Sequence, residues 1–183
     1  MPDAKPPLDG IVVVDFATTR AELAGRVLAE LGAEVFKIEP PAGAEARRLP
    51  PFDQSKAEDD PDRSLYWASV GGGKKSMVVD IEDAQARASL RGLLSQADIL
   101  IESFDPGEME RLGLSYPDVA ALNPGIIYAS VTPYGQDGPD AHSPATDLTL
   151  EAAGGALSTF DGDIQKRLLT LTRPGRVAYF TTG

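Results

Sequence analysis

Cysteine is absent from the 183-residue sequence, and histidine and tryptophan occur only once each. The lack of cysteine excludes disulfide bridges, thiolate metal sites and cysteine nucleophiles. No apolar run reaches the roughly 18 residues that a membrane-spanning helix needs, and the start, Met1-Pro-Asp-Ala-Lys, shows no charged-then-apolar leader. We therefore expect a cytoplasmic protein that has no membrane anchor and no metal site.

Positive charge is also scarce, because 17 lysines and arginines stand against 28 aspartates and glutamates, for a net charge of -11. A surface of this sign repels nucleic acid backbones and anionic membranes, so we expect neither as a partner. The apolar content of 42% is enough for a true core in one domain.

Short apolar runs alternate with segments of helical spacing, which predicts an α/β fold. The residues between positions 40 and 63 are charged, interrupted by proline and without period, and they predict a long loop that is functional or mobile. We expect a Rossmann-like, doubly wound and mostly parallel sheet. The predicted strands are 10–16, 33–39, 76–81, 98–102 and 125–131, and the predicted helices are 20–31, 64–70, 82–96 and 116–122.

Two segments bear on nucleotide binding. The first strand is followed by Ala17-Thr-Thr-Arg-Ala21, which lacks the dinucleotide fingerprint, so NAD is not expected. The stretch Val70-Gly-Gly-Gly-Lys-Lys-Ser76 has its serine one place too late for a Walker loop and runs into a strand instead of a helix. It indicates a glycine-rich turn whose backbone amides are still able to meet a phosphate of a larger ligand.

Seven segments, in this order, resemble the class III coenzyme A transferases, which include formyl-CoA and carnitine-CoA transferases and are related to α-methylacyl-CoA racemase. The resemblance implies that residues 1–183 are the N-terminal part of the large domain, truncated before the small domain. It further implies a CoA thioester as substrate without a tightly bound cofactor, and a homodimer or a second CoA-transferase module as partner. The segments are Leu8–Phe16, Leu31–Pro40, Gly73–Asp80, Ala97–Gly107, Leu112–Tyr116, Leu122–Val131 and Tyr134–Pro139.

The same resemblance implies a set of CoA-contacting residues, and it places the glycine-rich turn and the strand after it along the CoA site. It gives the lysines of the glycine-rich turn a diffuse positive charge toward phosphates, and it sets Glu82 where a basic residue can occur. The implied contacts are Thr19, Arg20, Ala21, Lys74, Lys75, Val79, Ser103, Phe104 and Arg111.

The catalytic residues of the family are not matched. By resemblance, the transferases attack the acyl-CoA carbonyl with an aspartate four residues before a glycine, and here Tyr179 holds that place before Gly183. A phenol with a pKa of about 10 is mostly protonated at neutral pH and does not form the anhydride. The racemases use a histidine just before an aspartate, but Thr146 precedes Asp147.

Asp147 and Glu151 are four residues apart on an expected helix and therefore share a face. His142, the only histidine, is expected in a loop. Two carboxylates on one face are either an acid–base pair or an exposed acidic surface.

Three functions remain open at this point. The chain is the CoA-binding part of a transferase completed by other residues, a degenerate structural or partner module, or a variant enzyme that uses Asp147 for proton transfer or hydrolysis on an acyl-CoA. The sequence is compatible with a fragment, a tandem module or a whole gene product.

Overall fold

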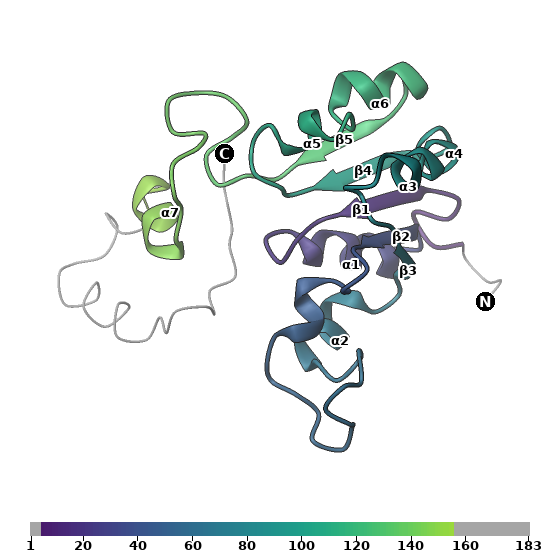
Figure 1. Cartoon of the computed structure of the whole chain (residues 1–183), viewed down its shortest axis with the longest axis vertical. Helices are drawn as coiled ribbons and strands as arrows, with labels where there is room; N and C mark the ends of the chain where they lie inside the picture. Colours follow the sequence, from purple (N-terminus) through teal and green to yellow (C-terminus); the bar gives the residue numbers. More distant parts are fainter. Residues whose placement is uncertain (1–4, 156–183) are drawn as a thin grey trace. The chain divides into compact units, whose positions relative to one another are not determined.

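The computed structural model describes residues 5–155, and its first compact unit, which ends at Thr132, is built on a sheet of five parallel strands (Figure 1). The sheet order β3-β2-β1-β4-β5 is that of a Rossmann-like, doubly wound fold, which confirms the prediction. The strands are β1 (Val12–Phe16), β2 (Glu34–Glu39), β3 (Lys75–Val78), β4 (Ile99–Glu102) and β5 (Ile127–Ser130).

The side chains of each central strand alternate between the two faces of the sheet, and two hydrophobic clusters result. On one face Val13, Val35 and Ile101 pack with Leu28 and Ala29 of α1 (Glu22–Glu30). On the other face Val14 and Leu100 belong to the larger cluster, which α3 (Ala84–Ser89), α4 (Arg91–Leu94), α5 (Glu108–Arg111) and α6 (Tyr116–Leu122) cover. The sheet is thus a middle layer between helices.

Several helices begin after a residue whose side chain caps the first turn. The side chain of Ser64 accepts the Trp67 N–H at the start of α2 (Leu65–Gly71), and Asp83 does the same for Gln85 before α3. A capping box of Ser115 and Asp118 opens α6. Such caps satisfy the free N–H groups of a first helical turn.

Two predicted segments require correction. The helix expected over residues 82–96 is interrupted at the buried Leu90, so that α3 and α4 are separate elements. The expected loop 40–63 contains a short 3-10 helix, η1 (Glu45–Arg48), and Phe52 pairs with Ser64 in an isolated antiparallel bridge. The break at Leu90 has no proline or glycine at its own position to announce it, and the 3-10 helix is too short to show a period.

The described residues 133–155 belong to a second compact unit. Its described part contains α7 (Asp147–Ala153), which begins at the cap Thr146. Asp147 and Glu151 therefore lie on one helix, as predicted. The Tyr134 hydroxyl also contacts this helix, 3.2 Å from the hydroxyl oxygen of Thr149.

Candidate functional site

The loops after β1 and β4 meet at the carboxyl edge of the sheet, where the direction of strand addition reverses. β1 lies between β2 and β4, and the chain leaves β1 toward α1 on one face and β4 toward α5 on the other. In open α/β sheets, ligands bind in the crevice outside such a point. Residues 17–21 and 103–105 are therefore the candidate site.

Thr18 and Ser103 join these two loops. The Thr18 N–H donates to Ser103 Oγ at 2.8 Å, and the two hydroxyl oxygens are also 2.8 Å apart. Arg20 Nη1 adds a hydrogen bond to Asp105 Oδ1 at 2.7 Å and one to the Ser103 carbonyl at 3.3 Å. The two loops thus form a single structural unit across the reversal point.

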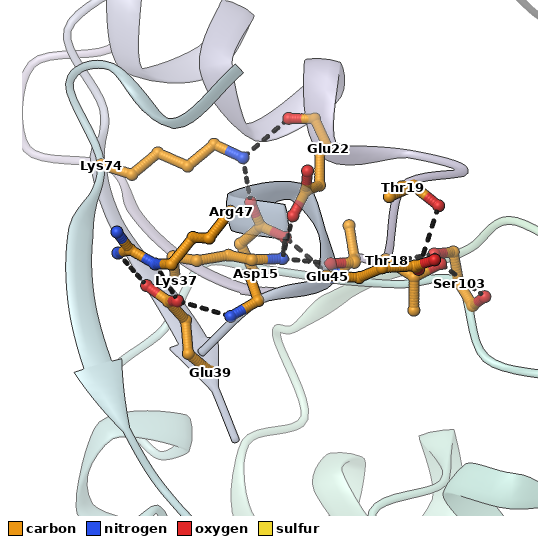
Figure 2. Close-up of polar contacts among 12 residues, drawn as sticks. Asp15, Thr18, Thr19, Glu22, Lys37, Glu39, Glu45, Arg47, Lys74 and Ser103 are labelled. Carbon is orange, nitrogen blue, oxygen red and sulfur yellow. Dashed lines mark hydrogen bonds and ion pairs between the residues drawn. The ribbon is translucent and has the colours of Figure 1, made fainter. Parts of the chain in front are cut away.

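Four charged side chains lie beneath the first loop and form what we call the charged cluster: Asp15, Glu22, Lys37 and Lys74 (Figure 2). Lys74 Nζ is 2.8 Å from Asp15 Oδ2. Lys37 Nζ is 3.5 Å from Asp15 Oδ1 and 3.4 Å from Glu22 Oε1. No side chain of the cluster is more than 2% exposed, so two positive and two negative charges are enclosed together.

Burial changes the proton affinity of the cluster. It raises the pKa of Glu22, and the positive charges of Lys37 and Lys74 offset only part of this effect. It lowers the pKa of Lys74, against the attraction of Asp15. Glu22 Oε2 is buried without a hydrogen-bond partner in the described chain, which is consistent with a carboxyl that is costly to ionise.

The charged cluster holds the backbone of the loop above it. Asp15 Oδ1 accepts the Ala17 N–H at 2.8 Å, and Lys37 Nζ donates to the Ala17 carbonyl. Gly25 of α1 leaves the necessary space, because a Cβ at this position would lie 2.2 Å from Asp15 Oδ2 and 3.0 Å from Lys74 Cε. Helix α1 therefore presents a polar, recessed face to β1.

A second buried ion pair lies at the end of β2. Arg47 of η1 donates to both carboxylate oxygens of Glu39, at 2.6 and 2.7 Å, and the Ala44 N–H donates to Glu39 Oε2 at 2.8 Å. Burial raises the pKa of Glu39, but hydrogen bonds from Arg47, Ser76 and Ala44 outweigh it and lower this pKa to about 2.

The same ion pair places η1 beside the candidate site. Arg47 lies 4.0 Å from the ring of Trp67 and 2.6 Å from Asp62 Oδ1, so it connects β2 with α2 and with the preceding loop. Glu45 Oε2 accepts a hydrogen bond from the hydroxyl of Thr19 at 3.4 Å (Figure 2).

Arg111 of α5 is half-exposed and already paired. It donates to both oxygens of Glu82, at 2.6 and 2.9 Å, and to Glu108. The hydrogen bond from Arg111 lowers the pKa of Glu82. A phosphate that binds Arg111 would have to exchange with a carboxylate.

The structure brings together most of the residues expected to contact CoA. Thr19, Arg20 and Ala21 lie in the first loop, and Ser103 and Phe104 lie in the second, where the Phe104 N–H donates to Glu102 Oε2 at 2.9 Å.

Val79 lies in the loop that follows β3, and Arg111 is the last residue of α5, the helix that follows β4. Val79 is buried in the core, and its N–H donates to the Glu39 carbonyl at 2.8 Å. Val79 thus supports the carboxyl edge from below instead of presenting a side chain to it.

The two lysines of the glycine-rich turn lie elsewhere, and their expected place needs correction. Lys74 has no exposed side-chain surface because its ammonium group enters the charged cluster. Lys75 begins β3, at the opposite end of the strand from the carboxyl edge, and pairs with Glu34. Neither lysine presents free charge to a phosphate at the candidate site.

A cavity of about 680 Å³ opens beside η1, at the carboxyl ends of β2 and β3. Five carboxylates line it, against three arginines, which makes it unfavourable for a phosphate. The acidic residues are Glu39, Glu58, Asp59, Asp60 and Asp62. The loops at the reversal point are the better candidate for an anionic ligand.

In the second unit, the Asp147 carboxyl lies in the first turn of α7, and its Oδ1 is buried without a hydrogen-bond partner in the described chain. His142 is exposed in a loop, as expected. Tyr179, the residue expected in place of the nucleophile, lies outside the described residues.

Sequence reasoning did not single out Asp15, Glu22 and Lys37. A signal was present for two of them. Asp15 and Lys37 are charged residues inside the apolar runs Val13-Val-Asp15 and Val35-Phe-Lys37, and buried parallel strands usually carry apolar side chains there.

Residues 5–155 contain no group of three or more side chains arranged to hold a metal ion. Among the helices of the same residues, none has the length and apolar character to cross a membrane.

Comparisons with known proteins agree on one family. A family model described as CoA-transferase family III matches residues 8–179. The probable fatty acyl-CoA transferase Rv3272 of Mycobacterium tuberculosis is 42% identical over 158 residues, which are 85% of this chain and 39% of that protein. Acetyl-CoA:oxalate CoA-transferase of Acetobacter aceti is 39% identical over 158 residues, which are 84% of this chain and 39% of that protein.

Solved structures give the same result. A CAIB/BAIF family protein from Brucella suis superimposes with a TM-score of 0.76 at 30% identity, over 98% of this chain and 44% of that chain. A crystal structure of Rv3272 gives 0.74 at 36% identity, over 96% of this chain and 45% of that chain. The chain therefore spans about two fifths of the length of the curated relatives it matches, 39% in both cases.

Proposed function

The chain belongs to CoA-transferase family III, and we propose that it provides the CoA-binding part of an enzyme that transfers CoA between carboxylic acids. The junction of Thr18 with the buried Ser103 carries the proposal, because it joins the two loops at the point where such sheets bind ligands. Relatives named for acetyl-CoA:oxalate and succinate–glutarate transfer support the substrate class.

We propose that CoA lies along the two loops with its phosphates toward Arg20 and Arg111. A guanidinium group binds a phosphate through two parallel hydrogen bonds, as it binds a carboxylate. Asp105 and Glu82 occupy these positions in the described structure and would be displaced or shared. Because the net charge of the chain is -11, the local arginines must overcome a repulsive background, and binding should be weak and salt-sensitive.

We further propose that the transfer step requires a carboxylate from outside this chain. In the proposed reaction, the carboxylate attacks the thioester carbonyl, and CoA leaves as a thiolate from the resulting mixed anhydride. The thiolate then attacks the carbonyl of the catalytic carboxyl group, which forms a new CoA thioester there and releases the first acid as a carboxylate. With Tyr179 in the place implied for the nucleophile, the described loops would bind the thioester without cleaving it. This is the first of the three functions that the sequence leaves open, a CoA-binding part that other residues complete.

Isothermal titration calorimetry with CoA tests the proposal. We expect binding that weakens on raising the salt from 0.05 to 0.5 M, and further weakening in Arg111→Gln. The matched control is Arg91→Gln, which removes the same charge from the exposed first residue of α4. No heat at millimolar CoA, from a sample with a cooperative unfolding transition, would refute the function.

A second candidate function rests on Asp147, whose Oδ1 is buried and lacks a hydrogen-bond partner in the described chain. A carboxylate without a committed donor is able to accept a proton from the α-carbon of an acyl-CoA. Exchange of the α-proton of an acyl-CoA in deuterated water, followed by mass spectrometry, detects this activity. Loss of exchange in Asp147→Asn, with retention in Glu151→Gln, would assign it to Asp147.

A further inference from the structure

Lys37 lies in the middle of a buried strand, where an apolar side chain would be usual. A buried ion pair generally stabilises a fold no more than well-packed apolar residues of similar volume. The contribution of Lys37 to the core therefore does not by itself account for its presence. Its contacts point to a more local role.

The ammonium group of Lys37 binds one peptide group of the candidate site. Lys37 Nζ donates to the carbonyl of Ala17, and the N–H of the same peptide group belongs to Thr18. That N–H donates to Ser103 Oγ at 2.8 Å. The peptide between Ala17 and Thr18 is thus held on one side by β2 and on the other by the loop after β4.

This arrangement makes a continuous chain of hydrogen bonds across the point where the strand order reverses. Hydrogen bonds in series polarise and strengthen one another, and a charged donor strengthens the first of them. Asp15 fixes the preceding N–H, that of Ala17, at 2.8 Å. The orientation of the first loop is therefore determined from inside the sheet.

We propose that Lys37 is a positioning residue for CoA binding: through the Ala17–Thr18 peptide it fixes the loop 17–21 against Ser103. The role in CoA binding rests on the function proposed above. The placement of the loop by Lys37 does not, and it has a separate measurement.

The charged cluster allows the positioning role to be separated from charge balance. Lys37→Met alone leaves two carboxyl groups with one ammonium group in a buried space. Lys37→Met combined with Glu22→Gln leaves Asp15 and Lys74, an ion pair of 2.8 Å, with no net charge. The double variant removes the donor to Ala17 and keeps the cluster neutral. Glu22→Gln alone retains the bond from Lys37 to Ala17 and leaves two ammonium groups with one carboxylate, so it measures the effect of unbalanced charge separately.

Hydrogen–deuterium exchange of the peptide spanning residues 16–22, with CoA calorimetry on the same samples, tests the proposal. In the double variant we expect this peptide to exchange about tenfold faster and the affinity for CoA to fall about tenfold, the loss that corresponds to one hydrogen bond from a charged donor. Peptides from β1 and β4 should exchange at the wild-type rate. Glu22→Gln should behave as the wild type in both measurements.

Wild-type exchange of residues 16–22 in a folded double variant would overturn the proposal. So would a double variant that fails to fold, since Lys37 would then stabilise the whole domain instead of one loop. Faster exchange with unchanged CoA affinity would overturn the role in binding. If the wild-type chain binds no CoA, the proposed function fails, while the exchange rates still decide whether Lys37 places the loop.

Discussion

Replacement of Glu39 by glutamine should remove a large, pH-dependent part of the stability of the domain. Glu39 is 1% exposed and accepts hydrogen bonds from Arg47 and from the Ala44 N–H. Its pKa in the folded chain is about 2, against the ordinary 4.5. Glutamine has nearly the shape of the protonated acid, so the variant represents the neutral state at every pH.

The magnitude follows from the difference between the two pKa values. A drop from 4.5 to about 2 corresponds to about 3 kcal/mol of free energy of unfolding at neutral pH, at about 1.36 kcal/mol for each unit. Because the folded-state pKa is the lower one, this stabilisation is fully present above pH 4.5 and is lost as the pH falls through about 2. The same linkage leaves about 1.4 kcal/mol at pH 3.

Trp67 provides the assay. It is the only tryptophan of the chain, and Arg47 lies 4.0 Å from its ring, so its fluorescence reports the structure around η1. Urea unfolding of wild type and Glu39→Gln, followed by this fluorescence at pH 7, 5 and 3, gives the difference in free energy of unfolding at each pH. Other titrating groups cancel in that difference.

A suitable control lies on the same strand. Glu34 also forms an ion pair, with Lys75, but its side chain is 45% exposed. Glu34→Gln should therefore change the free energy of unfolding by less than about 1 kcal/mol at any of these pH values. A Glu39→Gln variant that is as stable as the wild type at pH 7, or a difference that stays constant down to pH 3, would refute the reasoning.

Three further predictions concern the candidate site and its support. Gly25→Ala should lower the free energy of unfolding in urea by about 1–3 kcal/mol, because its Cβ would meet Asp15 Oδ2 at 2.2 Å. Gly92→Ala, whose Cβ would meet nothing within 4 Å, should be neutral or stabilising. Glu82→Gln should tighten CoA binding in calorimetry about twofold to fivefold by releasing Arg111. An equal gain in Glu110→Gln, which removes a negative charge from α5, the helix of Arg111, would assign the effect to net charge instead. Incubation of the unmodified chain with an acyl-CoA should give no covalent adduct in mass spectra, and an adduct mapped to Asp147 would contradict the assignment of a missing nucleophile.

The elements of the sheet could be predicted from the sequence because buried parallel strands give short apolar runs. The bounds of α6 were predicted at both ends, since Ser115 caps its start and Asn123-Pro124 ends it. The break at Leu90 could not be predicted, because leucine favours helix and the interruption arises from packing against the sheet.

The position of Lys74 shows why the candidate site was only partly predictable. A lysine beside glycines indicates an exposed charge on local grounds, yet its side chain reaches Asp15, 59 residues away in the chain. The helical spacing of α1 has a similar limit. Leu23 and Val27 are 59% and 46% exposed, while Glu22 and Gly25 face the sheet. A period identifies a helix, but the partner surface decides which of its faces is buried.

The order of the strands also has a consequence for synthesis of the chain. β1 gains its first neighbour when residues 34–39 have been made, but its second neighbour, β4, begins only at Ile99. At about 5–20 residues per second, the open edge of β1 waits about 3–12 s for its partner. During that interval the apolar residues Val13 and Val14 lie next to unpaired backbone groups, which are a template for pairing with another nascent chain. The pairing of β1 with β4 that creates the candidate site thus also closes an edge through which a ribosome-bound chain is open to aggregation.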